Sequence, residues 1–449
     1  MSELPKGWIK TKLSVVGNTV TGNTPPRKNP EFYGGNVPFV KPGDIDIDKE
    51  LIHSDETLSE LGCDKARVLK KGSVLVTCIG NIGRVGLAMK PMATNQQINA
   101  IEFNDLILPK YGFHYCRTLS TWLNFNASAT TVAIINKSKF SEAPFILAPL
   151  AEQKRIVEKL DEVLAQVDTI KARLDGVPAL LKRFRQSVLA AAVSGKLTEE
   201  WRGGAIPKWE ATVFSDICNE ITVGFVGKMK DKYTDSGVLF LRSQNVRAFK
   251  YDPKNVLFIS EEFHNEIHKS HLNAGDLAIV RSGAPGTTCV IPESLGKVNC
   301  SDLVIARPSE RLNPKFGCIF MNSEVAQKNV ASNQVGIAQQ HFNVGSMKKM
   351  PIELPDLAEQ QEIVRLVDQY FAFADTIEAQ VKKAQARVDN LTQSILAKAF
   401  RGELVPQDPN DEPADKLLER IAQARNEAEA LAKAAKKVEA AKKRAVKSA

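Results

Sequence analysis

The sequence contains no long apolar run and little cysteine. Its uninterrupted hydrophobic stretches, such as Phe145–Leu150, are far shorter than the ~20 residues that a membrane-spanning helix needs. The seven cysteines of this 449-residue chain are an odd, scattered set without a Cys-x-x-Cys pair, so we expect neither a disulfide framework nor a zinc site. The first residues are charged and lead into no apolar segment of the signal-peptide kind. We therefore expect a cytoplasmic protein without membrane contact.

Motifs of catalysis are also missing. No Gly-x-x-x-x-Gly-Lys-[Ser/Thr] phosphate loop occurs, and no Ser/His/Asp or Cys/His arrangement can be named from spacing. Asn29-Pro-Glu-Phe32 differs by one residue from the Asn-Pro-Pro-Phe motif of amino-methyltransferases, but it lacks a nearby glycine-rich cofactor fingerprint and is interpreted as a turn. His264, His268 and His271 would share one face of a helix, a geometry that can hold Zn²⁺, although a surface helix is the simpler interpretation. We assign no catalytic residue, metal ligand or cofactor to the chain.

The net charge is small for a protein of this length. With 60 basic and 52 acidic residues the formal net charge is +8, which is only a weak preference for polyanions. Much of the excess lies in the last segment, 414–449, whereas residues 355–413 are acidic. Charge by itself therefore gives little support to nucleic-acid binding.

An internal duplication is the strongest signal in the sequence. The segment Leu150–Val157 (LAEQKRIV) recurs as Leu357–Val364 (LAEQQEIV). The segment Gln186–Leu197 (QSVLAAAVSGKL) recurs as Gln393–Leu404 (QSILAKAFRGEL). Both recurrences are separated by 207 residues, so no residue is inserted or lost between the two matches. Repeats of this kind predict two copies of one structural element.

Each copy continues as a regular heptad of apolar residues. The spacing alternates between four and three, which predicts a coiled-coil helix of about 40 residues, roughly 60 Å long. Gly176 and Pro178 predict a kink in the first helix. Two amphipathic helices buried in a globular core are the alternative. The heptad positions are Ile156, Leu160, Val163, Val167, Ile170, Leu174, Val177, Leu181, Phe184 and Val188 in the first copy, and Ile363, Val367, Tyr370, Ala374, Ile377, Val381, Ala384, Val388, Leu391 and Ile395 in the second.

The segments before the two helices combine short strand-like runs with Gly/Pro/Asn turns, and they are fainter copies of each other. Leu4-Pro-Lys-Gly-Trp8 corresponds to Ile206-Pro-Lys-Trp209, and Val37–Ile45 corresponds to Val238–Val246. We expect an α+β fold in which two globular domains alternate with two long helices as an internal repeat.

The expected boundaries follow from these matches. They are 1–148 for the first domain, 149–203 for the first helix, 204–354 for the second domain, 355–404 for the second helix and 405–449 for a C-terminal tail. The tail begins with a Pro/Asp/Asn segment and is expected to continue as an Ala/Lys/Glu helix whose apolar anchors, near its start, include Leu417, Leu418 and Ile421. Most of this tail looks dispensable.

Both globular segments carry turn-rich stretches that combine Arg or Lys with Asn, Gln or Ser. Such side chains grip phosphates and read base edges. Any one polar loop is weak support, but some recur at corresponding positions, such as Lys41 and Arg242. The DNA-binding candidates are Asn23, Thr24, Arg27, Lys28, Lys41, Asn81, Arg84, Asn95, Gln96 and Gln97 in the first segment, and Lys228, Lys230, Arg242, Ser243, Gln244, Asn245, Arg247, Arg281, Ser282, Gln339, Gln340 and His341 in the second.

The order of variable segment, Leu-Ala-Glu-Gln-headed helix, variable segment and Leu-Ala-Glu-Gln-headed helix resembles the specificity subunit of type I restriction–modification enzymes. Pro149–Lys154, Leu180–Ser187 and Leu391–Leu404 are similar to the conserved regions of the IA class. Thr21–Pro25 with Val37–Asp44 is similar to a widespread first target-recognition domain. The resemblance covers essentially the whole chain.

The resemblance implies a subunit without a catalytic centre that binds double-stranded DNA. Each recognition domain would read one half of an interrupted target, and the helices would pack antiparallel as a spacer, although heptads alone also permit parallel packing. Two modification subunits that methylate adenine N6 with S-adenosylmethionine, and restriction subunits that use ATP and Mg²⁺, would dock on this chain. A stand-alone DNA-binding regulator and a coiled-coil scaffold that binds no DNA are the alternatives. The candidates for subunit docking are Leu150, Glu152, Gln153, Leu357, Glu359, Gln360, Gln186 and Gln393.

Overall fold

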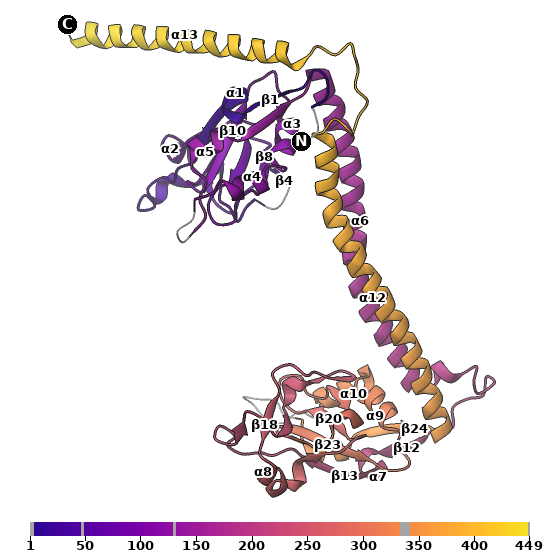
Figure 1. Ribbon diagram of the computed structural model, residues 1–449. Helices are drawn as coiled ribbons and strands as arrows, with labels where there is room; N and C mark the ends of the chain where they lie inside the picture. Colours follow the sequence, from indigo (N-terminus) through magenta and orange to yellow (C-terminus); the bar gives the residue numbers. More distant parts are fainter. Residues whose placement is uncertain (1–3, 46–48, 129–131, 333–341, 448–449) are drawn as a thin grey trace. The chain divides into compact units, whose positions relative to one another are not determined.

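The computed structural model describes residues 4–45, 49–128, 132–332 and 342–447. The chain forms two compact units, of residues 1–173 with 385–449 and of residues 174–384. Each unit contains one α+β domain and parts of both long helices (Figure 1). Both ends of the sequence therefore belong to the first unit. Within the described ranges, no helix combines the length and apolar character that crossing a membrane requires.

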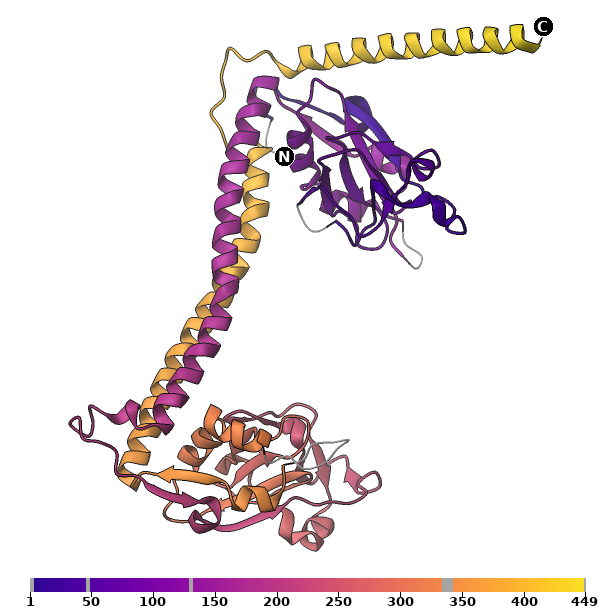
Figure 2. The same cartoon turned by 180° about the vertical axis from the view of Figure 1, so that it is seen from behind.

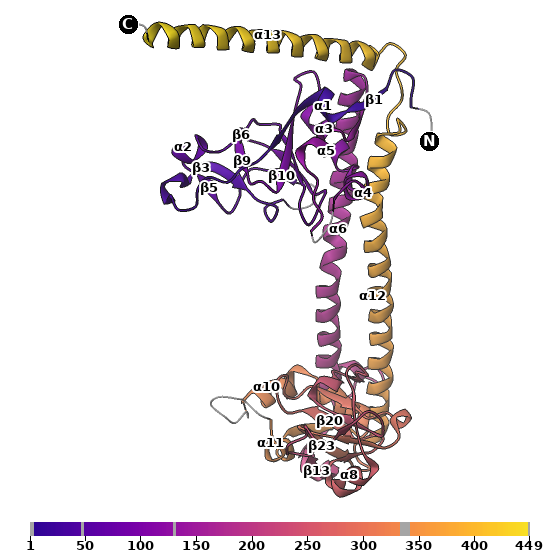
Figure 3. The same cartoon turned by 60° about the vertical axis from the view of Figure 1, so that its left-hand side comes forward.

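The first domain is built on two sheets (Figures 1 and 3). The strand orders are β2-β10-β7-β8-β4 and β5-β3-β9-β6, and a separate antiparallel pair of β1 with β11 ties the start of the domain to its end. The strands are β1 (Ile9–Lys12), β2 (Gly17–Thr21), β3 (Tyr33–Val40), β4 (Lys49–Leu51), β5 (Thr57–Leu58), β6 (Val68–Leu69), β7 (Val74–Thr77), β8 (Val85–Ala88), β9 (Met92–Thr94), β10 (Ile98–Phe103) and β11 (Pro144–Leu147). The helices are α1 (Leu13–Val16), η1 (Pro30–Phe32), α2 (Glu60–Cys63), α3 (Pro109–Cys116), α4 (Ser120–Phe125) and α5 (Lys137–Ser141).

The second domain repeats this plan (Figures 1 and 2). Its sheets have the orders β13-β23-β20-β21 and β14-β18-β15-β22-β19, with β12 paired to β24 and a hairpin of β16 and β17. The strands are β12 (Glu210–Val213), β13 (Cys218–Val223), β14 (Tyr233–Thr234), β15 (Val238–Leu241), β16 (Val246–Arg247), β17 (Lys250–Tyr251), β18 (Leu257–Ile259), β19 (His271–Leu272), β20 (Leu277–Val280), β21 (Thr288–Val290), β22 (Val298–Cys300), β23 (Leu303–Pro308) and β24 (Pro351–Leu354). The helices are α7 (Phe214–Ile217), η3 (Ser243–Asn245), α8 (Glu261–Glu266), η4 (His268–Ser270), η5 (Glu293–Leu295), α9 (Pro314–Met321), α10 (Glu324–Ser332) and α11 (Val344–Lys348).

The duplication extends to topology. The order β13-β23-β20-β21 repeats β2-β10-β7-β8, and β18-β15-β22-β19 repeats β5-β3-β9-β6. The two domains differ beside the first of these sheets, where β4 pairs in parallel with β8 in one domain and the β16–β17 hairpin forms in the other. The predicted α+β internal repeat is confirmed.

Alternation along the central strands explains the layers. Val74 and Val76 on β7 face a core shared with α3, whereas Leu75 between them faces a second core that the smaller sheet closes. On β20, Leu277 and Ile279 likewise face the helices, and Ala278 faces the smaller sheet. Each domain is therefore helices, a larger sheet and a smaller sheet in three layers.

The two long helices are α6 (Leu150–Val193) and α12 (Leu357–Ala399). They pair antiparallel within each unit (Figures 1 and 3). In the first unit, Glu152 bonds Gln407 just beyond α12, and further along α6 the Lys171 Nζ–Asp389 Oδ1 distance is 2.9 Å. In the second unit, Arg185 of α6 pairs with Asp375 of α12 (2.6 Å), and the later residue Thr198 bonds the earlier residue Glu359. Residues later in the α6 segment thus pair with residues earlier in the α12 segment, as antiparallel packing requires.

Burial along the helices follows the predicted heptads only in part. Ile170, Tyr370 and Leu391 lie at heptad positions but are 40–44% exposed. These three heptad positions are therefore only partly covered by the helix pairing. The helix α6 continues without interruption through Pro178, where a kink was expected.

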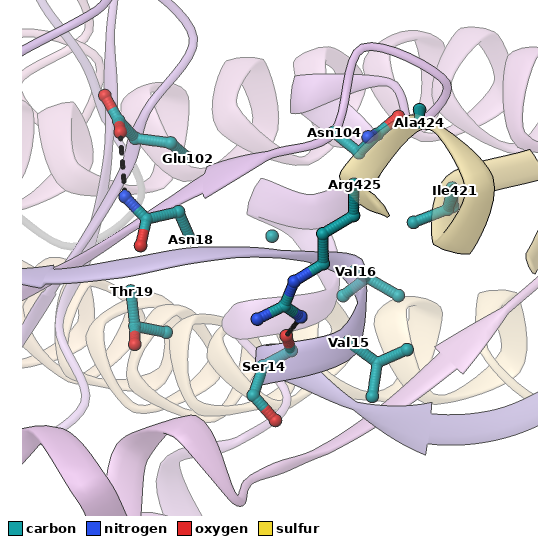
Figure 4. Close-up of a pocket in the computed structure, with 11 residues that line it drawn as sticks. Ser14, Val15, Val16, Asn18, Thr19, Glu102, Asn104, Ile421, Ala424 and Arg425 are labelled. Carbon is teal, nitrogen blue, oxygen red and sulfur yellow. Dashed lines mark hydrogen bonds between the residues drawn. The ribbon is translucent and has the colours of Figure 1, made fainter. Parts of the chain in front are cut away.

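The C-terminal helix α13 (Ala414–Lys447) begins inside the core of the first unit. Leu417 and Ile421 are 1% and 2% exposed and belong to the same cluster as Leu13 and Val16 of α1. Figure 4 shows the next turn, where Arg425 Nη1 donates to the Ser14 carbonyl oxygen (3.0 Å) and both residues line a cavity of about 550 Å³. The expectation that most of this tail is dispensable is therefore wrong for its first turns.

Candidate nucleic-acid interface

The predicted DNA-binding residues lie in loops that correspond between the two domains. In the first domain these are the loop after β2 (Asn23 to Lys28), the end of β3 (Lys41), and the β7–β8 and β9–β10 loops. In the second they are the loop after β13 (Lys228, Lys230), the segment after β15 and the β20–β21 loop. Gln339, Gln340 and His341 lie outside the described residues.

In the first domain, one carboxylate gathers two of the candidate cations. Arg27 donates to both oxygens of Glu56 (3.1 and 2.9 Å), and Lys41 Nζ lies 2.5 Å from Glu56 Oε1. These hydrogen bonds, Arg27 first, lower the pKa of Glu56. The Arg27 guanidinium also lies 5.1 Å from the centre of the Tyr33 ring. The cluster holds two cations against one carboxylate and is suited to a phosphate or an electronegative base edge.

The amides of the first domain hold its loops together. Thr24 Oγ1 donates to Gln96 Oε1 (2.8 Å), Asn95 Nδ2 donates to Gln97 Oε1 (3.0 Å), and Asn23 binds the backbone of the segment before β6. In the β7–β8 loop, Asn81 accepts from the Arg84 guanidinium at 2.9 and 3.0 Å in the amide orientation that satisfies both groups. These residues lie in one set of mutually supporting loops.

In the second domain, two candidate arginines bind neighbouring segments of the same domain. Arg242 Nη2 donates to the Asn255 carbonyl oxygen (3.0 Å), and Arg281 lies 3.8 Å from Asp302, whose carbonyl oxygen accepts from Ser243 Oγ (3.3 Å). Of the remaining candidates, Gln244 donates to the same Asn255 carbonyl oxygen as Arg242 (3.2 Å). Gln244 and Asn245 bond backbone carbonyls of the 252–255 segment, Arg247 pairs with Asp252 on the hairpin (3.4 Å), Lys228 and Lys230 are exposed, and Ser282 lies on the β20–β21 loop.

A glycine pair recurs in the candidate loops and was missed in the sequence. Gly80 and Gly83 have φ of +73° and +94°, and Gly283 and Gly286, at the same turn of the second domain, have +87° and +84°. These values are left-handed, where a side chain is disfavoured. The repeated Gly-x-x-Gly spacing in Ile79–Arg84 and Ser282–Thr287 is the signal that could have identified the turn.

The repeated Leu-Ala-Glu-Gln motif acts inside the protein. Trp8 Nε1 donates to Glu152 Oε2 (2.7 Å), and Trp209 Nε1 donates to Glu359 Oε2 (2.9 Å). Both tryptophans come from the repeated Pro-Lys-(Gly)-Trp segment that begins each domain. The motif glutamate therefore fastens the first strand of a domain to the helix that follows that domain. We call this contact the Trp–Glu clamp.

The motif glutamines make the same contacts in both copies. Gln153 Oε1 accepts from the Leu108 N–H (3.2 Å), and its Nε2 donates to the Ala148 carbonyl oxygen (2.9 Å). Gln360 Oε1 accepts from the Asn313 N–H (2.8 Å), and its Nε2 donates to the Pro355 carbonyl oxygen (2.8 Å). One glutamine thus ties the start of α3 or α9 to the strand-to-helix junction.

These contacts change the interpretation of the docking candidates. Glu152, Gln153, Glu359 and Gln360 are at most 4% exposed and are bonded within their own chain, so they offer no surface to another subunit. Their expected docking role is at odds with this burial. The other four candidates are accessible: Leu357 is 45% exposed, Gln186 and Gln393 are exposed, and Leu150 is partly so.

The two clamps differ in charge. Burial raises the pKa of Glu152, which the hydrogen bonds from Trp8 and Gln407 only partly oppose. Glu359 instead accepts from Arg202, whose side chain is 10% exposed, and from Thr198 Oγ1 (2.7 Å). The second clamp is therefore a buried ion pair, and the first is not.

The three histidines of the second domain do not share a helical face. The helix α8 ends at Glu266, His268 begins a short 3-10 turn, and His271 lies on β19. The His264 and His271 rings stack 3.8 Å apart, and His271 Nε2 bonds the His264 carbonyl oxygen (2.7 Å). The expectation of one surface helix is wrong, because the chain turns at Ile267. Among the described residues, no group of three or more His, Cys, Asp or Glu could hold a metal ion.

Comparison with known proteins assigns this arrangement to a family. The type I restriction modification DNA specificity domain matches residues 5–179 and, again, residues 194–385. The chain belongs to this family. It is 35% identical to the EcoBI specificity subunit of Escherichia coli, over 92% of this chain and 91% of that protein. It is 33% identical to the EcoKI specificity subunit of Escherichia coli strain K12, over 93% and 96%.

Solved structures agree on the fold. The HsdS subunit of Thermoanaerobacter tengcongensis matches with a TM-score of 0.58 and 20% identity, over 90% of this chain and 98% of that one. A chain solved in work on complex assembly and conformational transition of the type I R-M system matches with a TM-score of 0.66 and 20% identity, over 90% and 100%. The predicted specificity-subunit identity is confirmed, and with it a role in DNA sequence specificity rather than catalysis. The alternatives of a regulator or a scaffold find no support among these relatives.

Proposed function

We propose that this specificity subunit reads an interrupted, bipartite DNA target with one recognition domain per half-site. The observation that carries the proposal is that two domains of one topology are each fastened by the same Trp–Glu clamp to the same antiparallel helix pair. A duplicated reader on a spacer suits two half-sites about one DNA helical turn apart, roughly 34–36 Å. The functional division is 1–148 and 204–354 for reading, 149–203 and 355–404 for spacing and docking, and 405–449 for the tail.

The readers are the candidate loops described above. In the first domain, the Arg27–Lys41–Glu56 cluster and the Asn81–Arg84 pair supply donors whose geometry is already fixed by neighbours. Preorganised donors lose less conformational entropy when they meet a base edge or a phosphate. Arg242, Gln244 and Arg281 have the corresponding role in the second domain.

The helix pair is the docking surface for the partner subunits. Two modification subunits and the restriction subunits bind the chain, and S-adenosylmethionine, ATP and Mg²⁺ belong to those subunits. Support comes from apolar side chains that the pairing leaves uncovered: Leu180, Phe373 and Leu391 are 54%, 58% and 43% exposed. Gln186 and Gln393 lie on the same helices, and Leu150 and Leu357 begin them. The complex assembles in the cytoplasm.

The test is to express the chain with its modification subunits and to map N6-methyladenine in the host DNA by single-molecule sequencing. The expected result is one interrupted motif with a methylated adenine in each half, on opposite strands. Exchange of residues 1–148 for the first domain of a relative should change one half of the motif and leave the other intact. A continuous motif, or a change in both halves, would contradict the proposal.

A further inference from the structure

In the second domain, the loop with candidate DNA-binding residues also reaches the long helix. Its base is closed by two bonds to the Asn255 carbonyl oxygen, from Arg242 Nη2 (3.0 Å) and from Gln244 Nε2 (3.2 Å). Asn245 Nδ2 adds two more bonds, to the carbonyl oxygens of Asp252 (3.2 Å) and Lys254 (2.9 Å). The far end of the loop is the β16–β17 hairpin. The candidate readers and the hairpin tip therefore belong to one closed piece of backbone.

Phe249 forms the tip of this hairpin in a strained conformation. Its φ is +70°, in the left-handed region that a bulky side chain rarely adopts. Its N–H donates to the Thr288 carbonyl oxygen on β21 (3.0 Å), and its ring meets the ring of Phe371 on α12 edge to face, with centroids 5.2 Å apart. Strain of this kind persists where surrounding contacts fix the residue. The contact with Phe371 and the bond to β21 fix it here.

The first domain links its corresponding loop to the helix by charge instead. Glu50 on β4 lies 3.0 Å from Lys110 Nζ, and Lys110 Nζ lies 2.9 Å from Asp161 of α6. The Lys–Asp part of this link recurs in the second domain as Lys315 with Asp368 of α12 (2.8 Å). The loop contact does not recur: Glu50 makes it in one domain and Phe249 in the other. Strand β4 of the first domain thus reaches α6 through Lys110, and the β16–β17 hairpin of the second domain reaches α12 through Phe249.

We propose that Phe249 is a positioning residue that fixes where the Arg242–Asn255 loop of the second domain lies along α12. Phe249 thereby sets which spacer lengths between half-sites the protein accepts. The inference rests on the proposed bipartite reading. Loss of the aromatic contact frees the loop tip, so the domain tolerates a half-site displaced along the DNA. Aromatic pairs of this geometry contribute an amount that corresponds to roughly a threefold to tenfold change in an equilibrium.

The test uses the full-length chain with its modification subunits and synthetic duplexes that carry the mapped target, with the spacer at its natural length or one base pair longer or shorter. Methyl transfer from labelled S-adenosylmethionine is measured for each duplex. Phe371→Ala removes the contact from the helix side, where alanine suits the backbone, and Phe249→Ala removes it from the loop side. Both variants should lower the preference for the natural spacer about threefold to tenfold. Phe249→Tyr should retain it.

Tyr370→Ala is the matched control, because Tyr370 precedes Phe371 on the same helix and its ring packs against Phe184 of α6, with centroids 6.1 Å apart. It should leave the spacer preference unchanged. Equal loss of methylation on all three duplexes by Phe371→Ala and Phe249→Ala would overturn the inference, as would an unchanged ratio. If the wild-type complex methylates no interrupted target, the proposed function itself fails, which is a separate outcome.

Discussion

Glu152 and Glu359 occupy the same position of the repeat but meet different partners. Trp8 and Gln407 are neutral donors to Glu152, whereas Arg202 brings a buried positive charge to Glu359. A buried ion pair that loses one partner leaves an uncompensated charge, whereas a neutral hydrogen bond is replaceable by another acceptor. The glutamate carboxylate should therefore contribute differently to the unfolding free energy in the two clamps.

Glu359→Gln should therefore cost about 3 kcal/mol of unfolding free energy, and Glu152→Gln no more than about 1 kcal/mol. The glutamine oxygen still accepts from the tryptophan in both variants, so the comparison isolates the charge. Urea unfolding of the full-length chain, followed by tryptophan fluorescence, measures both. Equal losses would show that Arg202 is not paired as described.

These residues also mark what sequence alone could predict. The 207-residue offset between matching segments was enough to predict the repeat and its Leu-Ala-Glu-Gln motif, and the heptad spacing was enough to predict the long helices. The role of Glu152 and Gln153 was not accessible, because a short motif does not reveal whether its polar side chains face solvent or the protein interior. The partner, Trp8, lies far from Glu152 in sequence. Its recurrence as Trp209 was visible, but only the fold brings it to the motif.

At the scale of elements, the start of α13 is part of a core and its later turns are not. Ala414, Leu417 and Ile421 are fully buried beside α1, and Leu431 is 72% exposed. The sequence predicted Leu417, Leu418 and Ile421 as apolar anchors near the start of this helix, and Leu418 is partly buried. The sequence could not supply their partner, since α1 lies at the other end of the chain.

Leu417→Ala should destabilise the first unit by about 2–4 kcal/mol, because it opens a cavity in a packed core. Leu431→Ala, the matched control on the same helix, should change the unfolding free energy by less than about 0.5 kcal/mol. Truncation after residue 425 should behave like the control. A chain that ends at residue 413 and unfolds like the wild type would contradict the docking of α13.

The β16–β17 hairpin is an element that sequence comparison did not reveal. It stands where the first domain has β4, so the repeat breaks at this point. The strands are two residues each, too short for a periodic pattern to emerge. The candidate readers Arg242 and Gln244 were visible from their residue types, whereas the contact of the same loop with α12 was not.

For the whole molecule, we expect the length of the helix pair to set the length of the DNA spacer between the two half-sites, so that the pair acts as a ruler. Deletion of one heptad from each of α6 and α12, at facing positions, should shorten the spacer by about 10 Å, or roughly three base pairs at 3.4 Å each. Methylation mapping of the variant complex measures this directly. Deletion from one helix alone is the control, and it should disrupt the pairing of Lys171 with Asp389 and abolish activity. A motif with the original spacer after the double deletion would disprove the ruler.

The division of the chain into its two units also orders its biosynthesis. Residues 174–384 are complete once the ribosome has passed the middle of α12, whereas the first unit awaits residues 385–449. Ile395, Phe400 and Leu417 belong to the core that Trp8 and Leu13 begin. The domain translated first is thus the last to close. A chain truncated after residue 384 would therefore contain all of the second unit but would lack the part of the first unit's core that residues 395–421 supply.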